Sequence, residues 1–213
     1  MAKESYGTVL FTDIKASSEL WSESKDGMSE AIKLHEKQMQ RLVKKYDGMI
    51  IKSIGDAYMV YFSGVKSLDK AIEMSSALQM ELTKTKVIKV GSRNLLLRIG
   101  IAYGPILKRY MKIQDKRMLD LFGNTVNSAS RMESKVCEVN GIAFTDLRSS
   151  HDKINEEFVR AYGGRFNIEV IRYSKECPFE LKRSFRLVVD YHCEDLDKLK
   201  GVSSLVAYKM SLK

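Results

Sequence analysis

Hydrophobic positions in the first part of the chain switch between strand-like and helix-like spacing. Thr8 to Thr12 (TVLFT) is a β-branched and aromatic run, which predicts a buried strand ending at Asp13. Between Ser24 and Tyr46, apolar residues recur every three or four positions, and Asp47-Gly48 follows. This spacing predicts a long amphipathic helix that stops at the Asp-Gly pair.

The next segment has the pattern of a β-hairpin. Met49 to Ser53 and Tyr58 to Phe62 have strand composition, and Gly55-Asp56 between them is a strong tight-turn signal. Asp56 is therefore expected at the hairpin tip. A second amphipathic helix is expected to bury one face, made of Leu68, Ala71, Ile72, Ser75, Leu78 and Leu82.

The following stretch predicts three more elements. Leu95 to Ala102 has strand character, and we expect Gly104-Pro105 to end that strand. After a basic, irregular segment, Asn124 to Lys135 predicts a third helix and Gly141 to Thr145 a further strand. The order βαββαβ followed by αβ indicates an α+β fold, with a ferredoxin-like core whose antiparallel or mixed sheet is covered by helices.

The C-terminal third is harder to assign from its pattern. Possible strands lie at Phe166 to Arg172 and Phe185 to Tyr191, and Leu205 to Leu212 has the pattern of a last strand. We interpret residues 1–213 as one domain, with a core at 7–146, a long basic elaboration at 147–199 and a closing hairpin at 200–213.

Composition is that of an ordinary soluble globular domain, with 44% hydrophobic and 30% charged residues in 213. No apolar run approaches the roughly 20 residues that span a bilayer, and the start has no signal-peptide stretch. We therefore expect a cytoplasmic protein without a membrane segment. The three cysteines lack metal-type spacing and are expected to be reduced thiols.

The net charge and two aspartates suggest that the protein binds a polyanionic ligand together with a divalent metal ion. The formal charge of +9 suits a polyanion, which can be a nucleoside triphosphate, a nucleic acid or a membrane surface. Asp13 and Asp56 would lie side by side if their strands are neighbours, and such a pair suits Mg²⁺ or Mn²⁺. Taken singly, Asp13 also fits a helix N-cap and Asp56 a turn residue.

Four segments, in the same order, carry the signatures of a known family. They are LFTDIKASSELW, IIKSIGDAYMVYF, LRIGIAYGP and LDLFGNTVNSASRMES, which together span most of residues 7–146. This chain resembles class III nucleotidyl cyclases, the adenylate and guanylate cyclases. Near the C-terminus, LKGVSSLVAY resembles the family's short closing hairpin.

The resemblance implies a cyclisation reaction in which the ribose 3′-hydroxyl attacks the α-phosphate and pyrophosphate leaves. It implies two Mg²⁺ or Mn²⁺ ions per site, held by Asp13 and Asp56 with Ile14 as a further ligand. The backbone from Ile14 to Ser18, at the start of a helix, is expected to donate amides to the phosphates. The resemblance also implies that Lys200 neutralises the outgoing phosphates.

The third predicted helix carries a second set of site residues. Asn127 and Arg131 are four residues apart, so both project from one face. The resemblance implies that Asn127 orients the ribose and that Arg131 stabilises negative charge on the α-phosphate in the transition state.

Base choice rests on two further residues matched through the resemblance. Lys52 and Asp120 match the positions that read the purine. Adenine has an acceptor at N1 and a donor amino group, so a lysine donor and a carboxylate acceptor complement it, whereas guanine reverses that pattern. The pair therefore predicts an adenylate cyclase, which uses ATP.

Family cyclases are dimers whose metal-binding and transition-state residues come from opposite chains. This sequence carries both sets, so the resemblance implies a head-to-tail homodimer with two shared sites. Leu107 to Leu119 departs from the pattern because it lacks the usual small, glycine-containing arm. Rival readings are a cyclase making cyclic GMP or a cyclic pyrimidine nucleotide, and a silent nucleotide-binding regulatory module. A nucleic-acid-binding protein is a weaker rival.

Overall fold

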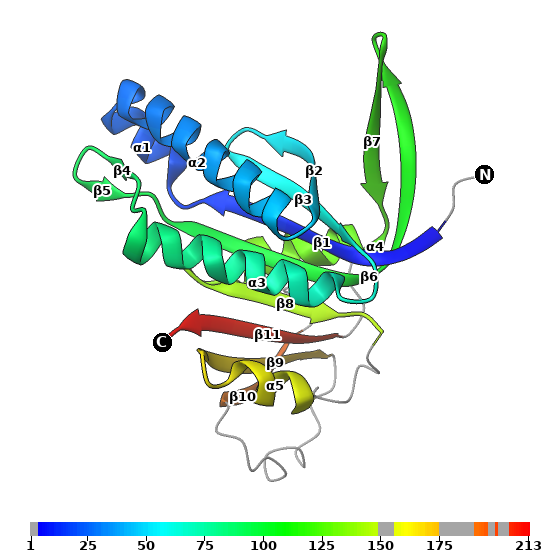
Figure 1. The fold of residues 1–213 in the computed structure, drawn as a ribbon. Coiled ribbons are helices and arrows are strands. Elements are labelled where there is room, and N and C mark those ends of the chain that lie inside the picture. The colour runs from blue at the N-terminus through cyan, green and yellow to red at the C-terminus, as the bar shows by residue number, and fades with distance from the viewer. Residues whose placement is uncertain (1–3, 149–155, 175–189, 196–198, 200–204) are drawn as a thin grey trace.

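The computed structural model describes residues 4–148, 156–174, 190–195, 199 and 205–213 (Figure 1). The strands are β1 Glu4–Ile14, β2 Gly48–Ile54, β3 Ala57–Ser63, β4 Lys89–Val90, β5 Arg93–Asn94, β6 Leu97–Ile113, β7 Lys116–Phe122, β8 Ile142–Asp146, β9 Phe166–Ser174, β10 Asp190–Asp195 and β11 Leu205–Leu212. The helices are α1 Ser17–Glu23, α2 Lys25–Lys45, α3 Ser67–Met80, α4 Asn124–Arg131 and α5 Glu156–Tyr162. Two π-helical turns, η1 Glu81–Thr85 and η2 Met132–Val136, extend α3 and α4.

One large sheet organises the described residues. Its strand order is β10-β9-β11-β8-β6-β1-β3-β2, with β7 paired to β6. The four strands β6-β1-β3-β2 are antiparallel to their neighbours, and β8 joins β6 in parallel. This is the predicted ferredoxin-like core, and the α+β assignment is confirmed. Of the helices in the described residues, none is long and apolar enough to cross a bilayer.

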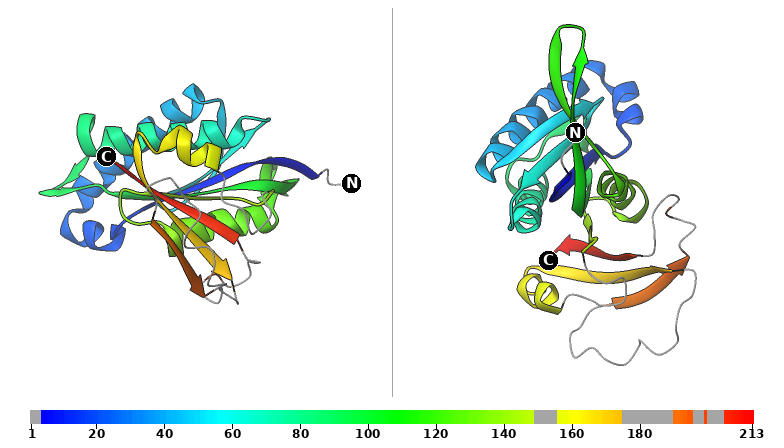
Figure 2. Two further views of the ribbon diagram at one scale, coloured as in Figure 1. Left: turned by 90° about the horizontal axis from the view of Figure 1, so that it is seen from below. Right: turned by 90° about the vertical axis from the view of Figure 1, so that its right-hand side faces the viewer.

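Helices cover both faces of this sheet (Figure 2). On β1, side chains alternate between the two faces, as they must in an extended chain. Leu10 packs in the cluster that includes residues of α2 and α3, whereas Val9 packs with Ala129 of α4. Leu10 and Val9 are both fully buried. The run TVLFT therefore contains no charged residue and shows no alternation of polar and apolar positions, because each face of the strand has its own core.

The long predicted helix is confirmed as α2, and it ends just before the Asp47-Gly48 pair, as expected. Its N-cap is Ser24, whose Oγ accepts a hydrogen bond from the Gly27 amide at 3.0 Å. After the helix ends, Asp47 adopts a left-handed conformation with φ 57° and the chain turns into β2. The β2–β3 hairpin is also confirmed, and Gly55 at its turn has φ 65°, which glycine adopts readily.

The predicted end of the strand at Gly104-Pro105 is wrong, because β6 continues to Ile113. Pro105 falls in a gap on one side of β6, where pairing with β8 has ended at Tyr103 and pairing with β7 has not yet begun at Leu107. On its other side β6 still pairs with β1, through Tyr6. A proline is tolerated at such a place because a ladder hydrogen bond is missing there anyway.

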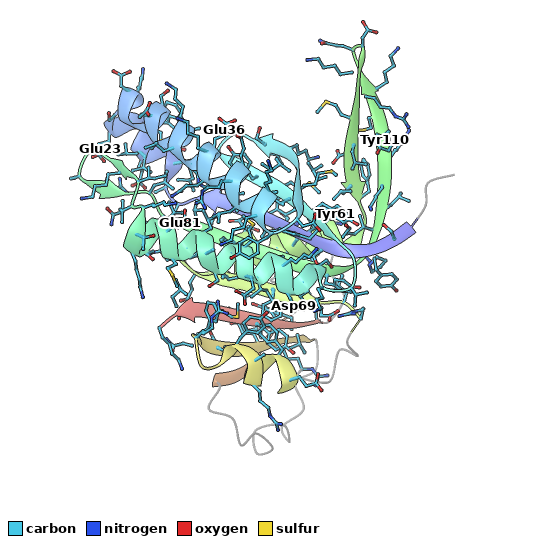
Figure 3. The ribbon with its side chains drawn as sticks, viewed as in Figure 1. Glu23, Glu36, Tyr61, Asp69, Glu81 and Tyr110 are labelled. Carbon is cyan, nitrogen blue, oxygen red and sulfur yellow. The ribbon has the colours of Figure 1, made fainter. Side chains whose placement is uncertain are left out.

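The basic segment predicted to be irregular instead forms a β-hairpin. β6 and β7 pair from Leu107 with Phe122 to Ile113 with Lys116, and the ribbon stands out from the body of the sheet (Figure 1). Tyr110 lies along this ribbon and Tyr61 near its base (Figure 3). Cations on both faces mask the alternation of apolar residues, because most of the ribbon beyond the buried Asp120 and Leu121 is exposed or only partly buried. The chain thus has an arm here, although without the expected glycines.

Residues after β8 add strands to the edge of the sheet. β11 pairs antiparallel with β8 and with β9, and β10 pairs parallel with β9. The strands predicted at Phe166 to Arg172 and Leu205 to Leu212 are confirmed. Of the strand predicted at Phe185 to Tyr191, residues 185–189 lie outside the described residues, and the described strand is Asp190–Asp195. Residues 200–204 also lie outside them, so the closing hairpin stays a prediction.

Helix α5 was not predicted from the sequence. It packs aromatic side chains onto the sheet. The centroid of the Phe158 ring lies 4.4 Å from that of the Phe144 ring and 5.5 Å from that of the Tyr208 ring. Tyr162 stacks on Phe158 at 4.5 Å. Because α5 has seven residues, it offers fewer than two periods of apolar repeat, too short for a helical pattern to stand out.

The buried His35 of α2 is expected to make stability depend on pH. Its side chain is 1% exposed, both ring nitrogens lack hydrogen-bond partners within the described residues, and burial lowers its pKa to about 4. Because the unfolded pKa is 6.5, the neutral ring favours folding fully above pH 6.5 and progressively less toward pH 4, by about 3 kcal/mol in all. Urea unfolding of the wild type and of His35→Leu between pH 4 and 8 measures this term. Equal pH slopes for both proteins would contradict it.

Candidate active site

Asp13 and Asp56 lie at the same end of neighbouring strands. β1 and β3 are antiparallel, and their last register pair is Thr12 with Tyr58. Asp13 is the next residue of β1 after Thr12, and Asp56 occupies the β2–β3 turn, two residues before Tyr58. The expectation that their strands are neighbours is confirmed, whereas metal binding by the two aspartates stays a prediction.

The chemistry of these two carboxylates fits a divalent cation such as Mg²⁺ or Mn²⁺. The Oδ2 atom of Asp56 is buried and has no hydrogen-bond partner within the described residues, so it retains an unused charge for a ligand. In the part of the chain that the structure describes, no group of three or more His, Cys, Asp and Glu side chains is placed to hold a metal ion by itself. Mg²⁺ commonly binds one or two carboxylates and completes its shell with substrate phosphates, and two carboxylates meet that need.

Arg98 belongs to the same site, although the sequence pattern does not single it out. It lies opposite Asp13 in the β1–β6 register, and its Nη2 donates a hydrogen bond to Asp13 Oδ2 at 2.6 Å. The signal available in the sequence is a charged residue between the apolar Leu97 and Ile99 on an otherwise buried strand. That signal identifies a partner for Asp13 only when the strand register is known.

The same guanidinium contacts a second carboxylate, that of Glu133 in η2. Arg98 Nη2 lies 3.0 Å from Glu133 Oε1, and the Glu133 side chain is 11% exposed. Burial raises the pKa of Glu133 to about 7, although Arg98 opposes the shift; the charge of Asp13 adds to it. Asp13 and Glu133 thus form a cluster of two acidic groups around one cation. Asp56 lies in the turn before β3, the strand that neighbours β1.

The backbone after β1 turns sharply into α1. Ala16 adopts the left-handed conformation with φ 57°, and the helix begins at Ser17. The Lys15 amide donates to the Leu96 carbonyl at 2.9 Å, so it is not free for a phosphate. Of the amides predicted between Ile14 and Ser18, those of the first turn of α1 remain, because the first amides of a helix have no partner within the helix. Phosphate binding by Ile14 and Ser18 stays a prediction.

Lys52 and Asp120 are brought together from distant parts of the chain. The Lys52 ammonium lies 2.8 Å from both carboxylate oxygens of Asp120. Asp120 is 8% exposed, and its Oδ1 also accepts a hydrogen bond from the Leu121 amide. A register shift between Ile50 and Lys52 re-aims the β2 side chains just before the lysine. The predicted pairing is therefore present in the geometry, while its role in base reading stays a prediction.

Helix α4 carries Asn127 and Arg131 on the face of the sheet opposite α2 and α3 (Figure 2). Asn127 is exposed and Arg131 partly exposed, and neither has a side-chain partner within the described residues. The start of the helix is tied to β6, because Thr125 Oγ1 donates to the Pro105 carbonyl at 2.6 Å. Both side chains are therefore available to a ligand. Lys200, the remaining predicted residue, lies outside the described residues.

Gly100 allows α4 and η2 to lie directly on β6, and Gly100→Ala is expected to undo this. A Cβ there would overlap the backbone nitrogen of Glu133 and the carbonyl oxygen of Ala129, and backbone atoms cannot move aside cheaply. We expect a loss of at least about 3 kcal/mol in the free energy of unfolding. The matched control is Gly164→Ala, where a Cβ meets no atom within 4 Å, so the effect should stay within about 0.5 kcal/mol. Urea unfolding measures both; equal losses would contradict the prediction.

Residues 1–170 match the sequence profile of the family described as adenylate and guanylate cyclase catalytic domain. The chain is also 30% identical over 179 residues to an adenylate cyclase of Schizosaccharomyces pombe. That alignment covers 72% of this chain and 10% of the relative. The chain therefore spans about a tenth of the length of that relative.

Solved structures share the fold. The catalytic core of a rhodopsin-guanylyl cyclase with converted specificity, in complex with ATPalphaS, has a TM-score of 0.70 at 20% identity and covers 100% of this chain and 98% of its own. The adenylyl cyclase CyaB from P. aeruginosa has a TM-score of 0.64 at 20% identity, with 100% and 97% covered. At this identity the two structures support the fold and do not select a nucleotide.

Proposed function

The chain belongs to the adenylate and guanylate cyclase catalytic domain family, and from this premise we propose that it converts ATP to 3′,5′-cyclic AMP and pyrophosphate. The observation that carries the choice of ATP is the pair formed by Lys52 and Asp120, whose charged atoms are 2.8 Å apart. Together they present one donor and one acceptor at a partly buried position. Adenine N1 accepts from the lysine, and the adenine amino group donates to the carboxylate.

Discrimination against guanine follows from the same pair. Guanine has a carbonyl oxygen where adenine has its amino group, so its O6 would face the Asp120 carboxylate with no proton between them. Because Asp120 is 8% exposed, water cannot easily relieve that contact. An unsatisfied or repelled polar group at a buried position costs about 1–3 kcal/mol or more, which disfavours GTP by about five- to 150-fold or more.

Asp13 and Asp56 are proposed to hold the divalent cations, with Ile14 contributing a further ligand. Cyclase domains of this family generally use Mg²⁺ or Mn²⁺. When bound, two such ions lower the pKa of the ribose 3′-hydroxyl and offset charge on the leaving pyrophosphate. Arg98 adds positive charge beside Asp13. The amides at the start of α1 are proposed to bind phosphate oxygens.

Arg131 and Asn127 are proposed to act on the α-phosphate and the ribose. The planar guanidinium of Arg131 is always charged and can grip two oxygens as negative charge builds on the α-phosphate. Asn127 lies one helical turn earlier on the same face, where its amide can hold the ribose with the 3′-hydroxyl in line. Lys200 is proposed to neutralise the outgoing phosphates.

The complete site is proposed to form between two copies of the chain, related head to tail. Arg131 and Asn127 lack partners within the described residues, which supports a role toward a ligand shared with another subunit. Large apolar side chains are exposed on β1, β2 and the β6–β7 hairpin, which fits an interface. They are Tyr6, Met49, Ile54, Leu107, Tyr110, Met118 and Phe122. A symmetric pair would then have two equivalent sites.

Product identification tests the proposal directly. The purified protein is incubated with ATP, GTP, CTP or UTP and either Mg²⁺ or Mn²⁺, and the nucleotide products are identified by mass. Cyclic AMP as the main product is the expected result. Cyclic GMP or a cyclic pyrimidine nucleotide would show that the base contacts are misassigned. Nucleotide binding without any cyclic product, under both metals, would favour a regulatory module instead.

A further inference from the structure

Arg98 is shared by two carboxylates that come from different layers of the fold. Its Nη2 lies 2.6 Å from Asp13 Oδ2 on β1 and 3.0 Å from Glu133 Oε1 in η2. The side chains are 31% exposed for Asp13 and 11% for Glu133. One guanidinium thus joins a proposed metal ligand to a buried acidic group that the reaction itself does not use.

The fold places Glu133 there by two specific devices. Gly100 lets the backbone of Ala129 and Glu133 lie against β6. At the end of α4 the helix widens into the π-helical turn η2, which contains Glu133. Single π-helical turns within helices frequently accompany functional sites. A carboxylate at such a position loses its hydration, and this loss costs free energy. A functional role beside Arg98 would explain why an acidic side chain is buried there.

The contacts around Arg98 allow a second orientation of its guanidinium. Arg98 Nε and Glu133 Oε1 are both buried atoms that lack a hydrogen-bond partner within the described residues. The contact between Arg98 and Glu133 is therefore an ion pair whose hydrogen-bonding capacity is unfilled, whereas that to Asp13 is a formed hydrogen bond. These two atoms could pair with each other if the guanidinium gave up its hydrogen bond to Asp13.

We propose that Glu133 is a positioning residue that draws Arg98 away from Asp13, so that the Asp13 carboxylate becomes available to a divalent cation. This inference rests on the proposed function, because it assumes that Asp13 binds the metal. An aspartate held by arginine must give up that ion pair before it coordinates Mg²⁺ or Mn²⁺. Glu133 lowers the cost of this exchange because it accepts the guanidinium that Asp13 releases.

Substitutions of Glu133 and of Arg98 are expected to change the metal affinity in opposite directions. Glu133→Gln keeps the side-chain shape but removes the competing charge, so Arg98 should stay on Asp13 and metal affinity should fall. Arg98→Gln removes the competitor itself, so metal affinity of Asp13 should rise. In the double variant the Glu133 change should have little further effect, because the guanidinium through which it acts is gone.

The experiment measures Mn²⁺ binding to the full chain without nucleotide, from the free-Mn²⁺ signal in electron paramagnetic resonance. We expect Glu133→Gln to weaken the Asp13-dependent binding by about tenfold and Arg98→Gln to strengthen it, within the 10- to 100-fold range typical of residues that contact metal ligands. The matched charge control is Glu138→Gln, an exposed glutamate just beyond η2 that pairs with Lys209, and it should leave binding unchanged. Glu133→Asp keeps the charge and should largely restore binding.

Several results would overturn the inference. Unchanged Mn²⁺ binding in Glu133→Gln would do so, as would equal weakening in the wild-type and Arg98→Gln backgrounds, since that indicates a direct effect of charge on the metal. If Glu133→Gln does not fold, Arg98→Gln alone still tests the proposal. Weaker or unchanged Mn²⁺ binding in that variant would contradict competition between Arg98 and the metal ion for Asp13. Failure of the proposed function looks different: the wild type would then show no Mn²⁺ binding that Asp13→Ala abolishes and would form no cyclic nucleotide.

Discussion

Asp13→Ala and Arg131→Ala are each expected to reduce cyclic AMP formation by at least about 100-fold, yet a mixture of the two proteins should be active. Asp13→Ala removes half of the carboxylate pair that is proposed to hold the metals. Arg131→Ala removes the cation proposed to face the α-phosphate, and loss of one transition-state donor typically costs about 100- to 1,000-fold. Each single variant therefore lacks one component in both of its sites.

Mixing separates a shared site from a site within one chain. In a dimer of one Asp13→Ala chain and one Arg131→Ala chain, one site has both defects and the other has neither. Random pairing of equal amounts makes about half of the dimers mixed, and half of their sites are intact, so recovery should approach a quarter of wild-type activity. Initial rates of cyclic AMP formation after equilibration of the mixture measure this.

The matched control is a mixture of Asp13→Ala with Asp56→Ala. Both changes affect the same half of the site, so every site in the mixed dimers keeps at least one defect and activity should stay low. Dimerisation of each mixture is checked by light scattering. If confirmed dimers of Asp13→Ala and Arg131→Ala stay inactive, the head-to-tail model with shared sites is wrong.

The core of the fold could be predicted because its sequence pattern follows local rules. Gly55-Asp56 is a tight turn, and the apolar repeat of α2 is long enough to identify a helix. Pro105 misled the interpretation, since whether a proline ends a strand depends on which neighbours that strand has at that point. Such information lies in the sheet topology, which a single sequence does not contain.

The candidate site likewise contains residues that could be predicted from the sequence and residues that could not. Asp13 and Asp56 could be selected because each follows a strong local signal, a strand end or a turn. Lys52 and Asp120 are 68 positions apart and were selected through the family resemblance, and the structure then places them in contact. Arg98 and Glu133 were selected neither by a local signal nor through the family resemblance. Their importance depends on the β1–β6 register and on the π-helical turn, and both follow from tertiary packing.

The double substitution Lys52→Glu with Asp120→Cys is expected to weaken the proposed use of ATP and to admit GTP. In the wild type, the ammonium and the carboxylate of the pair lie 2.8 Å apart, and they are proposed to present one donor and one acceptor to adenine. The new glutamate accepts where adenine also accepts, so kcat/KM for ATP should fall by at least about 100-fold. Removing Asp120 relieves the repulsion of guanine O6, so cyclic GMP should become detectable.

The two single variants show why both changes are needed. Lys52→Glu alone places a second carboxylate beside the buried Asp120, so like charges meet and neither nucleotide should be used well. Asp120→Cys alone leaves the Lys52 donor in place and should reduce ATP use without admitting GTP to the same extent. The ratio of kcat/KM for the two nucleotides, measured by product formation, should therefore shift more in the double variant than the single changes predict together. Lys66→Glu, the same charge reversal at an exposed position ahead of α3, should leave the ratio unchanged. A double variant that folds and keeps the wild-type ratio would exclude Lys52 and Asp120 from base reading, because no contact to N1 or the amino group could survive both changes.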